Sequence, residues 1–169
     1  MSKSGLREQI ITLLNQKQVE SAILQLNRIL KSTPENSQAL ALKSYALNKL
    51  ANERKEWKYS QSAFEHAQRA LLINPSDDLA LTSKGWAQID LGHAAEALIS
   101  LQQATMVNPR NEYAWYNLAW AQYLTGNAVS STDSIKRALD IDPGNQVIKC
   151  GKELMERGEI PEHLRKNVK

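Results

Sequence analysis

The chain has 169 residues, 42% of them hydrophobic, with seven glycines and five prolines. This composition excludes a disordered or fibrous protein and suits one domain with a buried core. Leu, Ala, Gln, Lys and Glu are frequent and β-branched runs are rare, which predicts an all-α fold.

The charge and the cysteine count exclude several kinds of partner and site. The formal net charge is only +3, and the basic residues after Lys149 are interspersed with glutamates, so we expect no nucleic-acid-binding surface. A single cysteine, Cys150, excludes an internal disulfide bond. The polar start of the chain, and the lack of an apolar run of about 20 residues, predict a cytoplasmic protein without membrane insertion.

Four prolines mark the organisation of the chain. They are spaced by 41, 34 and 34 residues, and each follows a segment with helical periodicity: Pro34, Pro75, Pro109 and Pro143. Proline lacks an N–H donor and clashes with the preceding turn, so each proline ends a helix. Two residues after each proline stands a side chain that can cap the next helix: Asn36, Asp77, Asn111 and Asn145. The sequence therefore predicts consecutive pairs of helices.

The first two predicted pairs are irregular. In the first pair, Ile10 and Ile29 occupy positions that hold small residues in the later pairs, so we expect its two helices to lie apart. The second pair has seven additional residues around 51–58 with no Gly or Pro, which predicts an extension of both helices. We expect Trp57 to pack within this longer hairpin, and the alternative is an exposed contact with a partner.

The third and fourth pairs are regular. Small residues face each other between their helices: Gly85 opposite Ala97, and Ala119 opposite Ser131. Gly92 and Gly126 stand where each first helix must stop, since glycine enters a left-handed conformation without steric cost.

One more helix is predicted after Pro143, over residues 146–158. Its apolar stripe consists of Val147, Cys150, Gly151 and Leu154, which is the pattern of a helix that closes the end of a stack. We expect Cys150 to be a small packed side chain rather than a reactive thiol. Residues 159–169 are polar, and we expect them to form a flexible tail.

The interval of 34 residues and the residues inside it resemble the tetratricopeptide repeat, whose pattern runs W-x2-L-G-x2-Y, then A-x3-F, then P. The fourth pair reads Trp115-x2-Leu118-Ala119-x2-Gln122, then Ser131-x3-Ile135, Ala138 and Pro143. The third reads Leu81-x2-Lys84-Gly85-x2-Gln88, then Ala97-x3-Leu101, Ala104 and Pro109. The resemblance implies a right-handed superhelix, an α-solenoid of antiparallel helix hairpins. The expected domain is residues 1–158, with units at 3–36, 37–77, 78–111 and 112–145.

The sequence shows no candidate catalytic or cofactor site. His66, His93 and His163 have no metal-ligand spacing with one another or with Cys150. There is also no glycine-rich phosphate-binding motif. We therefore expect neither an enzyme nor a bound metal or cofactor.

The resemblance implies that ligands bind the concave wall formed by the first helix of each unit. This wall carries aromatic and apolar residues instead of the Lys and Asn clamp with which some members of the family grip the carboxylate end of a partner. The predicted groove residues are Ile11, Leu14, Tyr45, Asn48, Trp86, Ile89, Tyr113, Tyr116, Asn117, Trp120 and Tyr123. We expect Trp86, Tyr116 and Trp120 to be exposed and Trp115 to be buried. The alternative is that the aromatics fill space between neighbouring helices or meet the closing helix.

The predicted function is that of an adaptor or chaperone that binds an apolar segment of another protein, extended or helical, in this groove. Two alternatives stay open. The apolar wall can instead pair two copies of the chain, as a homodimer or self-assembling scaffold. The chain is also similar in size and architecture to bacterial type III secretion chaperones.

Overall fold

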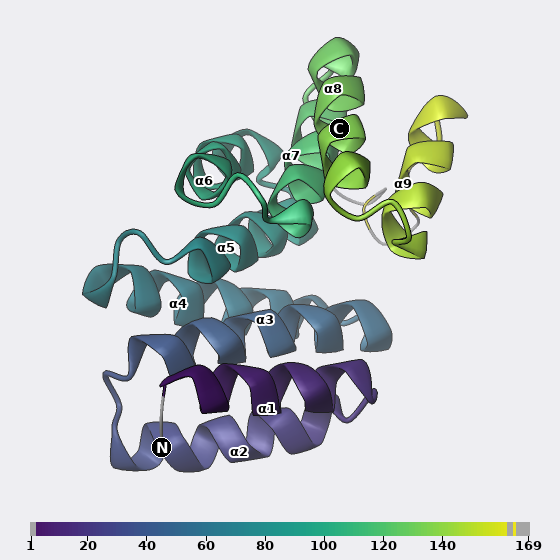
Figure 1. The fold of residues 1–169 in the computed structure, drawn as a ribbon. Coiled ribbons are helices and arrows are strands. Elements are labelled where there is room, and N and C mark those ends of the chain that lie inside the picture. The colour runs from purple at the N-terminus through teal and green to yellow at the C-terminus, as the bar shows by residue number, and fades with distance from the viewer. Residues whose placement is uncertain (1–2, 162–163, 165–169) are drawn as a thin grey trace.

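The structure, a computed structural model, describes residues 3–161 and residue 164, and it is built from α-helices joined by short turns (Figure 1). The helices are α1 (Lys3–Asn15), α2 (Val19–Ser32), α3 (Ser37–Arg54), α4 (Trp57–Ile73), α5 (Asp78–Asp90), α6 (Ala94–Val107), α7 (Glu112–Leu124), α8 (Ala128–Ile141) and α9 (Gln146–Glu156). The predicted all-α class is confirmed. Within the described residues, no helix has both the length and the apolar character needed to cross a bilayer.

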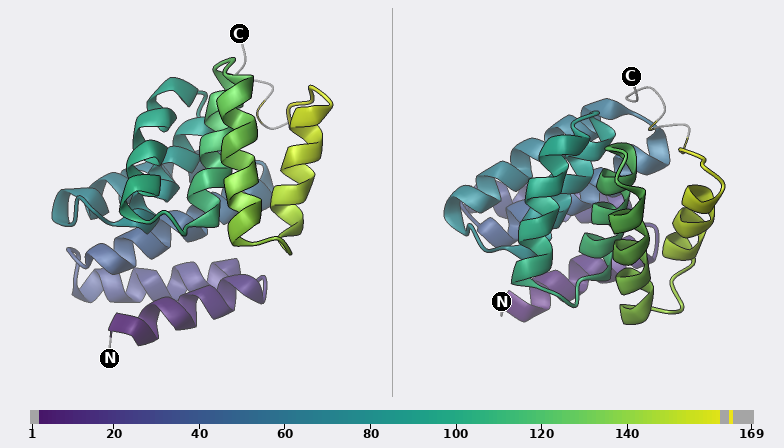
Figure 2. Two further views of the ribbon diagram at one scale, coloured as in Figure 1. Left: turned by 45° about the horizontal axis from the view of Figure 1, so that its top comes forward. Right: turned by 90° about the horizontal axis from the view of Figure 1, so that it is seen from above.

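The helices stack as an α-solenoid with an inner and an outer row. Helices α1, α3, α5 and α7 contact one another in succession and form the inner row, while α2, α4, α6 and α8 pack alongside them as the outer row. The helix axes rotate along the stack, from the nearly horizontal α1 to α3 to the upright α7 and α8 of Figure 1, and Figure 2 shows the same rotation from two other directions.

Small residues bring the two helices of a pair together. Ala63 and Ala97 are fully buried, and a side chain at Gly85 would overlap the side chain of Leu101. In contrast, α1 and α2 are less closely packed than the later pairs. This looser packing confirms the effect expected from the bulky Ile10 and Ile29.

The predicted capping residues begin the helices as expected. The side-chain oxygens of Asn36, Asp77 and Asn111 each accept a backbone N–H three residues later, at 2.9–3.1 Å. Asn145 accepts from the N–H groups of Val147 and Ile148 at the start of α9. Each cap satisfies donors that the helix itself leaves without a partner.

The turn between the two helices of each pair contains one residue with a left-handed backbone, which is glycine in two pairs and lysine in the other two. Gly92 and Gly126 have positive φ values of 85° and 84°, as predicted. The turns of the first two pairs place Lys17 and Lys55 in the same left-handed region, with φ values of 59° and 57°. A side chain is disfavoured there, because its Cβ crowds the backbone.

The second pair is longer, as the extra residues predict: α3 has 18 residues and α4 has 17, whereas α5 and α6 have 13 and 14. The prediction for Trp57 is wrong, since this residue is 72% exposed. Trp57 is the first residue of α4, at the tip of the long hairpin.

The closing helix α9 packs on only part of the predicted stripe: Gly151 is buried and Leu154 packs against the core as predicted, but Val147 and Cys150 do not. Ile148 is fully buried in a cluster with Ala119 and Ile135, whereas Val147 is 56% exposed and Cys150 is exposed. The expected burial of Cys150 is therefore wrong. The reason is that α9 is rotated by about one residue, so that Ile148 and Gly151 face the stack.

Candidate partner-binding groove

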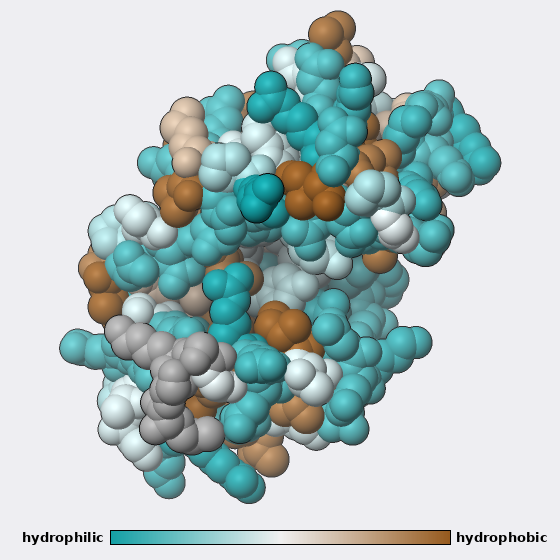
Figure 3. All heavy atoms as spheres, viewed as in Figure 1, coloured by the Kyte–Doolittle hydropathy of each residue, from teal (hydrophilic) through white to brown (hydrophobic). Residues whose placement is uncertain are grey.

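A cavity of about 190 Å³ opens between the inner helices α3, α5 and α7. Its walls are formed by Tyr45, Lys49, Asn52, Glu53, Trp86, Ile89, Asp90, Tyr113, Tyr116, Asn117, Trp120, Val147, Pro161 and Leu164. In the space-filling view the surface is hollowed between the half formed by α1 to α3 and the half formed by α5 to α8, and apolar side chains lie in the hollow (Figure 3). We call this cavity and its walls the inner groove.

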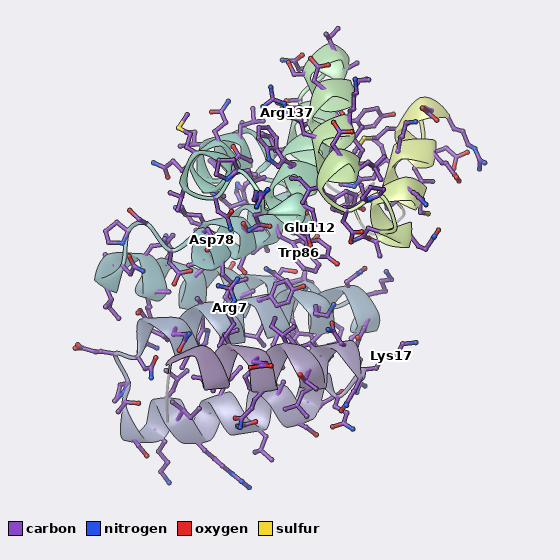
Figure 4. The ribbon with its side chains drawn as sticks, viewed as in Figure 1. Arg7, Lys17, Asp78, Trp86, Glu112 and Arg137 are labelled. Atoms are coloured by element: carbon purple, nitrogen blue, oxygen red, sulfur yellow. The ribbon has the colours of Figure 1, made fainter. Side chains whose placement is uncertain are left out.

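Aromatic side chains connect the walls of the inner groove. Tyr45 of α3 meets Trp86 of α5 edge to face, with ring centroids 6.1 Å apart. On α7, Trp120 makes the same kind of contact with Tyr116 at 6.5 Å and with Tyr123 at 5.8 Å. Trp86 of α5 faces Tyr45 of α3 and shares the cavity wall with Tyr113 near the start of α7 (Figure 4). Edge-to-face packing places a partly positive ring edge on a negative ring face, which fixes the orientation of these rings.

Seven of the eleven predicted groove residues line this cavity: Tyr45, Trp86, Ile89, Tyr113, Tyr116, Asn117 and Trp120. The remaining four lie elsewhere. Leu14 is buried and Ile11 partly buried in the core of the first hairpins. Asn48 is fully buried, and its Nδ2 donates to the carbonyl oxygen of Ser83 at 2.8 Å. Tyr123 lies near α9, in a separate hollow that also contains Met155.

The exposure expected for the aromatics needs correction. Trp120 is only 4% exposed, because Tyr116, Tyr123 and Leu164 pack in the same cluster. Trp86 and Tyr116 are partly buried. The ring of Tyr116 lies against Gly151 of α9, so for this residue the alternative of contact with the closing helix is the correct one.

Trp115, expected in the core, is only partly buried. Its Nε1 donates to the carbonyl oxygen of Pro109 at 2.9 Å. The guanidinium of Arg137 lies over its ring, 4.7 Å from the centroid. The hydrogen bond holds the polar nitrogen of the indole, and the cation lies on its apolar face, so both parts of this amphipathic side chain have a partner.

One edge of the inner groove is acidic. Glu53 and Asp90 both line it. Burial raises the pKa of Asp90 to about 7, against the opposing effects of a hydrogen bond from Ser60 and of the nearby Lys55. Burial also raises the pKa of Tyr45, and the neighbouring Tyr113 and Glu112 add to that shift. The ammonium of Lys49 lies 5.6 Å from the ring centroid of Tyr45.

Sequence reasoning missed the acidic edge and the end of the chain. Lys49, Asn52 and Glu53 belong to the last turns of the long helix α3, and the irregular proline interval was the available signal for them. Pro161 and Leu164 follow α9. The signal for Leu164 was its place among three apolar residues, Ile160, Leu164 and Val168, spaced by four in an otherwise polar segment.

The described residues bring no three His, Cys, Asp or Glu side chains together as a metal site. His93 is exposed beside Glu96, Nδ1 of His66 lies 2.8 Å from the carbonyl oxygen of Ser62, and His163 lies outside the described residues. The inner groove thus offers aromatic ring faces together with the carboxyl groups of Glu53 and Asp90 and the ammonium of Lys49, an arrangement that can bury apolar side chains of a ligand.

Comparison with known proteins extends these findings. A tetratricopeptide repeat family model matches residues 82–146. No curated protein sequence matches the chain significantly. Among solved structures, a thermophilic TPR protein of Thermus thermophilus is 18% identical, with a TM-score of 0.76 over 93% of this chain and 82% of that chain.

Two further structures are similar. The TPR protein YrrB, described as having an unusual peptide-binding site, is 20% identical, with a TM-score of 0.63 over 90% of this chain and 75% of that chain. The Sgt2 TPR domain from Aspergillus fumigatus is 22% identical, with a TM-score of 0.59 over 70% of this chain and 78% of that chain. The family match and the shared fold lead to one conclusion: residues 82–146 match the tetratricopeptide repeat family, and the chain has the fold of solved TPR proteins.

Proposed function

We propose that this protein is a non-enzymatic adaptor or chaperone that binds an apolar segment of a partner protein in the inner groove. In this proposal residues 1–158 act as one domain of four helix pairs and a closing helix. The observation that carries the proposal is the cavity between α3, α5 and α7, lined by aromatic side chains from all three helices.

The chemistry of the lining supports an apolar ligand. Tyr45, Trp86 and Tyr113 present aromatic surface to the cavity, and Tyr and Trp are the residue types that contribute most to binding energy at interfaces. The carboxylate of Glu53 at the edge favours a basic residue beside the apolar part of the ligand. A solved structure with the same fold, that of YrrB, is described as having a peptide-binding site.

The experiment is a selection of peptides from a random library, about twelve residues long, on the wild-type protein. Binding of the selected peptides is then measured by fluorescence anisotropy on wild-type, Trp86→Ala and Trp57→Ala proteins. We expect apolar peptides with a basic residue, and binding about tenfold weaker to Trp86→Ala. Trp57→Ala is the matched control, since Trp57 is an exposed tryptophan outside the cavity.

Two further measurements separate binding from folding. Thermal unfolding of Trp86→Ala shows whether lost binding reflects lost structure. Glu53→Lys changes only an exposed edge residue and should weaken binding of the basic peptides. Peptides that bind all three variants as tightly as the wild type would place the binding site elsewhere and contradict the proposal.

Self-association is a second candidate, and the outer row of helices favours it. Leu72 of α4 and Met106 of α6 are 84% and 77% exposed, and they are separated by one repeat interval of 34 residues. Ile73, Val107 and Ile141 continue the apolar edge at the same interval. Light scattering over a concentration range tests this candidate, and a constant monomer mass would exclude it.

A further inference from the structure

The chain reverses direction at the end of α9. Gly158 has a φ of 72°, and the N–H groups of Gly158 and Glu159 donate to the carbonyl oxygens of Met155 and Leu154 at 3.1 and 2.8 Å. These two bonds form a Schellman motif, in which a left-handed glycine turns the chain back along the helix it has just left. The following described residues are thereby directed toward the inner groove.

Pro161 and Leu164 enter the wall of the groove after this turn, and Ile160 packs beside them against the core. Leu164 is 4% exposed and packs in one cluster with Ile89 and Trp120, and Ile160 packs against the same cluster. Pro161 and Leu164 line the cavity that Tyr45 and Trp86 line from the side of α3 and α5. The N–H of Leu164 donates to the carbonyl oxygen of Pro161 at 2.9 Å, which holds these two residues together.

The position of these apolar residues in the sequence fits a ligand more than a structural element. Ile160, Leu164 and Val168 are spaced by four residues in a segment that is otherwise polar apart from Pro161. In a sequence, this spacing is the pattern by which short helical peptides fill a groove. A cavity of about 190 Å³ remains beside Pro161 and Leu164, so these residues fill the groove only in part.

We infer that Pro161 and Leu164 are built-in occupants of the inner groove, anchored by Ile160 on the adjoining cluster, and that a partner binds by displacing them with a segment of the same chemistry. That chemistry is two apolar side chains four residues apart, beside a proline. The inference rests on the proposed function, since it concerns the same groove.

The tether determines how strongly these residues compete. A short tether gives an effective concentration on the order of 1 mM. If the free segment binds the empty groove with a Kd of about 0.1 mM, the tethered segment weakens the apparent affinity of any competitor by about tenfold. The occupied groove thus selects for ligands that bind more tightly than the segment itself.

The experiment uses the full chain with Ile160→Ser and Leu164→Ser, which removes the apolar contacts. The probe is a fluorescein-labelled synthetic peptide of residues 159–169, whose binding is followed by anisotropy. We expect the peptide to bind the double variant about tenfold more tightly than it binds the wild type. A peptide carrying the same two serines should bind neither. Arg157→Ala, at an exposed residue near the turn, is the control variant and should behave like the wild type.

Three outcomes would overturn the inference. The first is a folded double variant that does not bind the peptide, and the second is equal binding by variant and wild type. The third is a double variant that loses its cooperative thermal unfolding, which would make Ile160 and Leu164 part of the core.

The failure of this inference can be told apart from the failure of the proposed function. If library peptides bind the wild type and the double variant equally well, the chain's own residues are not displaced on binding. That result contradicts this inference but leaves the proposed function intact. If the peptide of residues 159–169 binds the double variant but the library yields no ligand, the groove binds the chain's own residues but no partner. That result contradicts the proposed function.

Discussion

Gly151 of α9 lies against the ring of Tyr116 of α7, and a Cβ atom added to Gly151 would be 2.5 Å from Cε2 of that ring. The closing helix α9 therefore contacts α7 at a position where only glycine fits. This contact holds Tyr116 in the wall of the inner groove, and it makes the closing helix sensitive to a single methyl group.

Gly151→Ala should lower the free energy of unfolding by about 1–3 kcal/mol, because α9 or the ring of Tyr116 must move to admit the methyl group. Urea unfolding measures this change. Gly5→Ala is the matched control, since a Cβ at Gly5 of α1 meets nothing within 4 Å; alanine there should stabilise the helix by up to about 1 kcal/mol. A Gly151→Ala protein as stable as the wild type would show that α9 is not held by this contact.

Lys17→Gly and Lys55→Gly should each stabilise the protein by about 0.5–1 kcal/mol. Both residues have positive φ values, 59° and 57°, where a side chain costs about 1–2 kcal/mol, and glycine recovers most of that cost. Thermal unfolding of the two variants tests the prediction. Gly92→Ala and Gly126→Ala, at the equivalent turns, should have the opposite effect, and a common sign for both pairs of variants would refute the argument.

Asp90 should make stability depend on pH. Its pKa is raised from 3.8 to about 7 by burial, so the folded state binds more protons than the unfolded state between about pH 4 and pH 7. The free energy of unfolding should therefore fall as the pH rises through this range. Asp90→Asn should remove this fall and add about 1–2 kcal/mol of stability at about pH 8, as urea unfolding at several pH values can show.

Ser60→Ala is the companion of that test. The hydroxyl of Ser60 donates to Oδ2 of Asp90 at 3.1 Å and lowers its pKa. Its removal should extend the fall in stability to higher pH. If the stability of Asp90→Asn depends on pH as that of the wild type does, another titrating group causes the dependence.

Two equivalent hydrogen bonds should stabilise the third and fourth pairs. Ser100 Oγ donates to Oε1 of Gln88 at 2.8 Å, and Ser134 Oγ donates to Oε1 of Gln122 at 2.7 Å. Ser100→Ala and Ser134→Ala should each cost about 1–3 kcal/mol in urea unfolding, because the glutamine oxygen loses its donor. Ser130→Ala, on the same helix as Ser134 but without this bond, is a control, and a loss equal to that of Ser134→Ala would argue against the hydrogen bond as the cause.

Trp120→Ala should cost about 3–5 kcal/mol of stability, since Trp120 is 4% exposed and packed in the main cluster of the later pairs. Differential scanning calorimetry gives the loss directly. Trp57→Ala, which removes an exposed tryptophan, should change the unfolding temperature little. A small effect of Trp120→Ala would indicate that this ring is mobile and available to ligands.

The features that were predictable from the sequence depend on local chemistry. Asn111 caps α7 because its side chain reaches an N–H three residues away, and Gly92 ends its helix because only the local backbone matters there. The extension of α3 followed from seven residues without a helix breaker. Lys17 and Lys55 escaped prediction because nothing in a lysine indicates a left-handed conformation.

Features that depend on packing between distant segments were predicted less well. An apolar stripe on a helix is wide enough to face the core in two rotations. Without the neighbouring helix, the sequence could not show whether Cys150 or Ile148 is the buried residue. Trp120 was expected to be exposed because its position in the unit faces the concave side, yet Leu164, 44 residues later, lies in the cluster that buries it. Seven groove residues were predicted because the inner row follows the repeat, which makes equivalent positions neighbours in space.

The longer helix α3 has a consequence for how a ligand is positioned. In a stack of equal units, a bound segment can slide by one unit and find the same surface again. Asn52 and Glu53 stand on the last turns of α3 and form part of the cavity wall, and no other inner helix in the described part of the chain is as long. The extra turns break the translational symmetry of the wall, so a segment bound beside α3 has a single register.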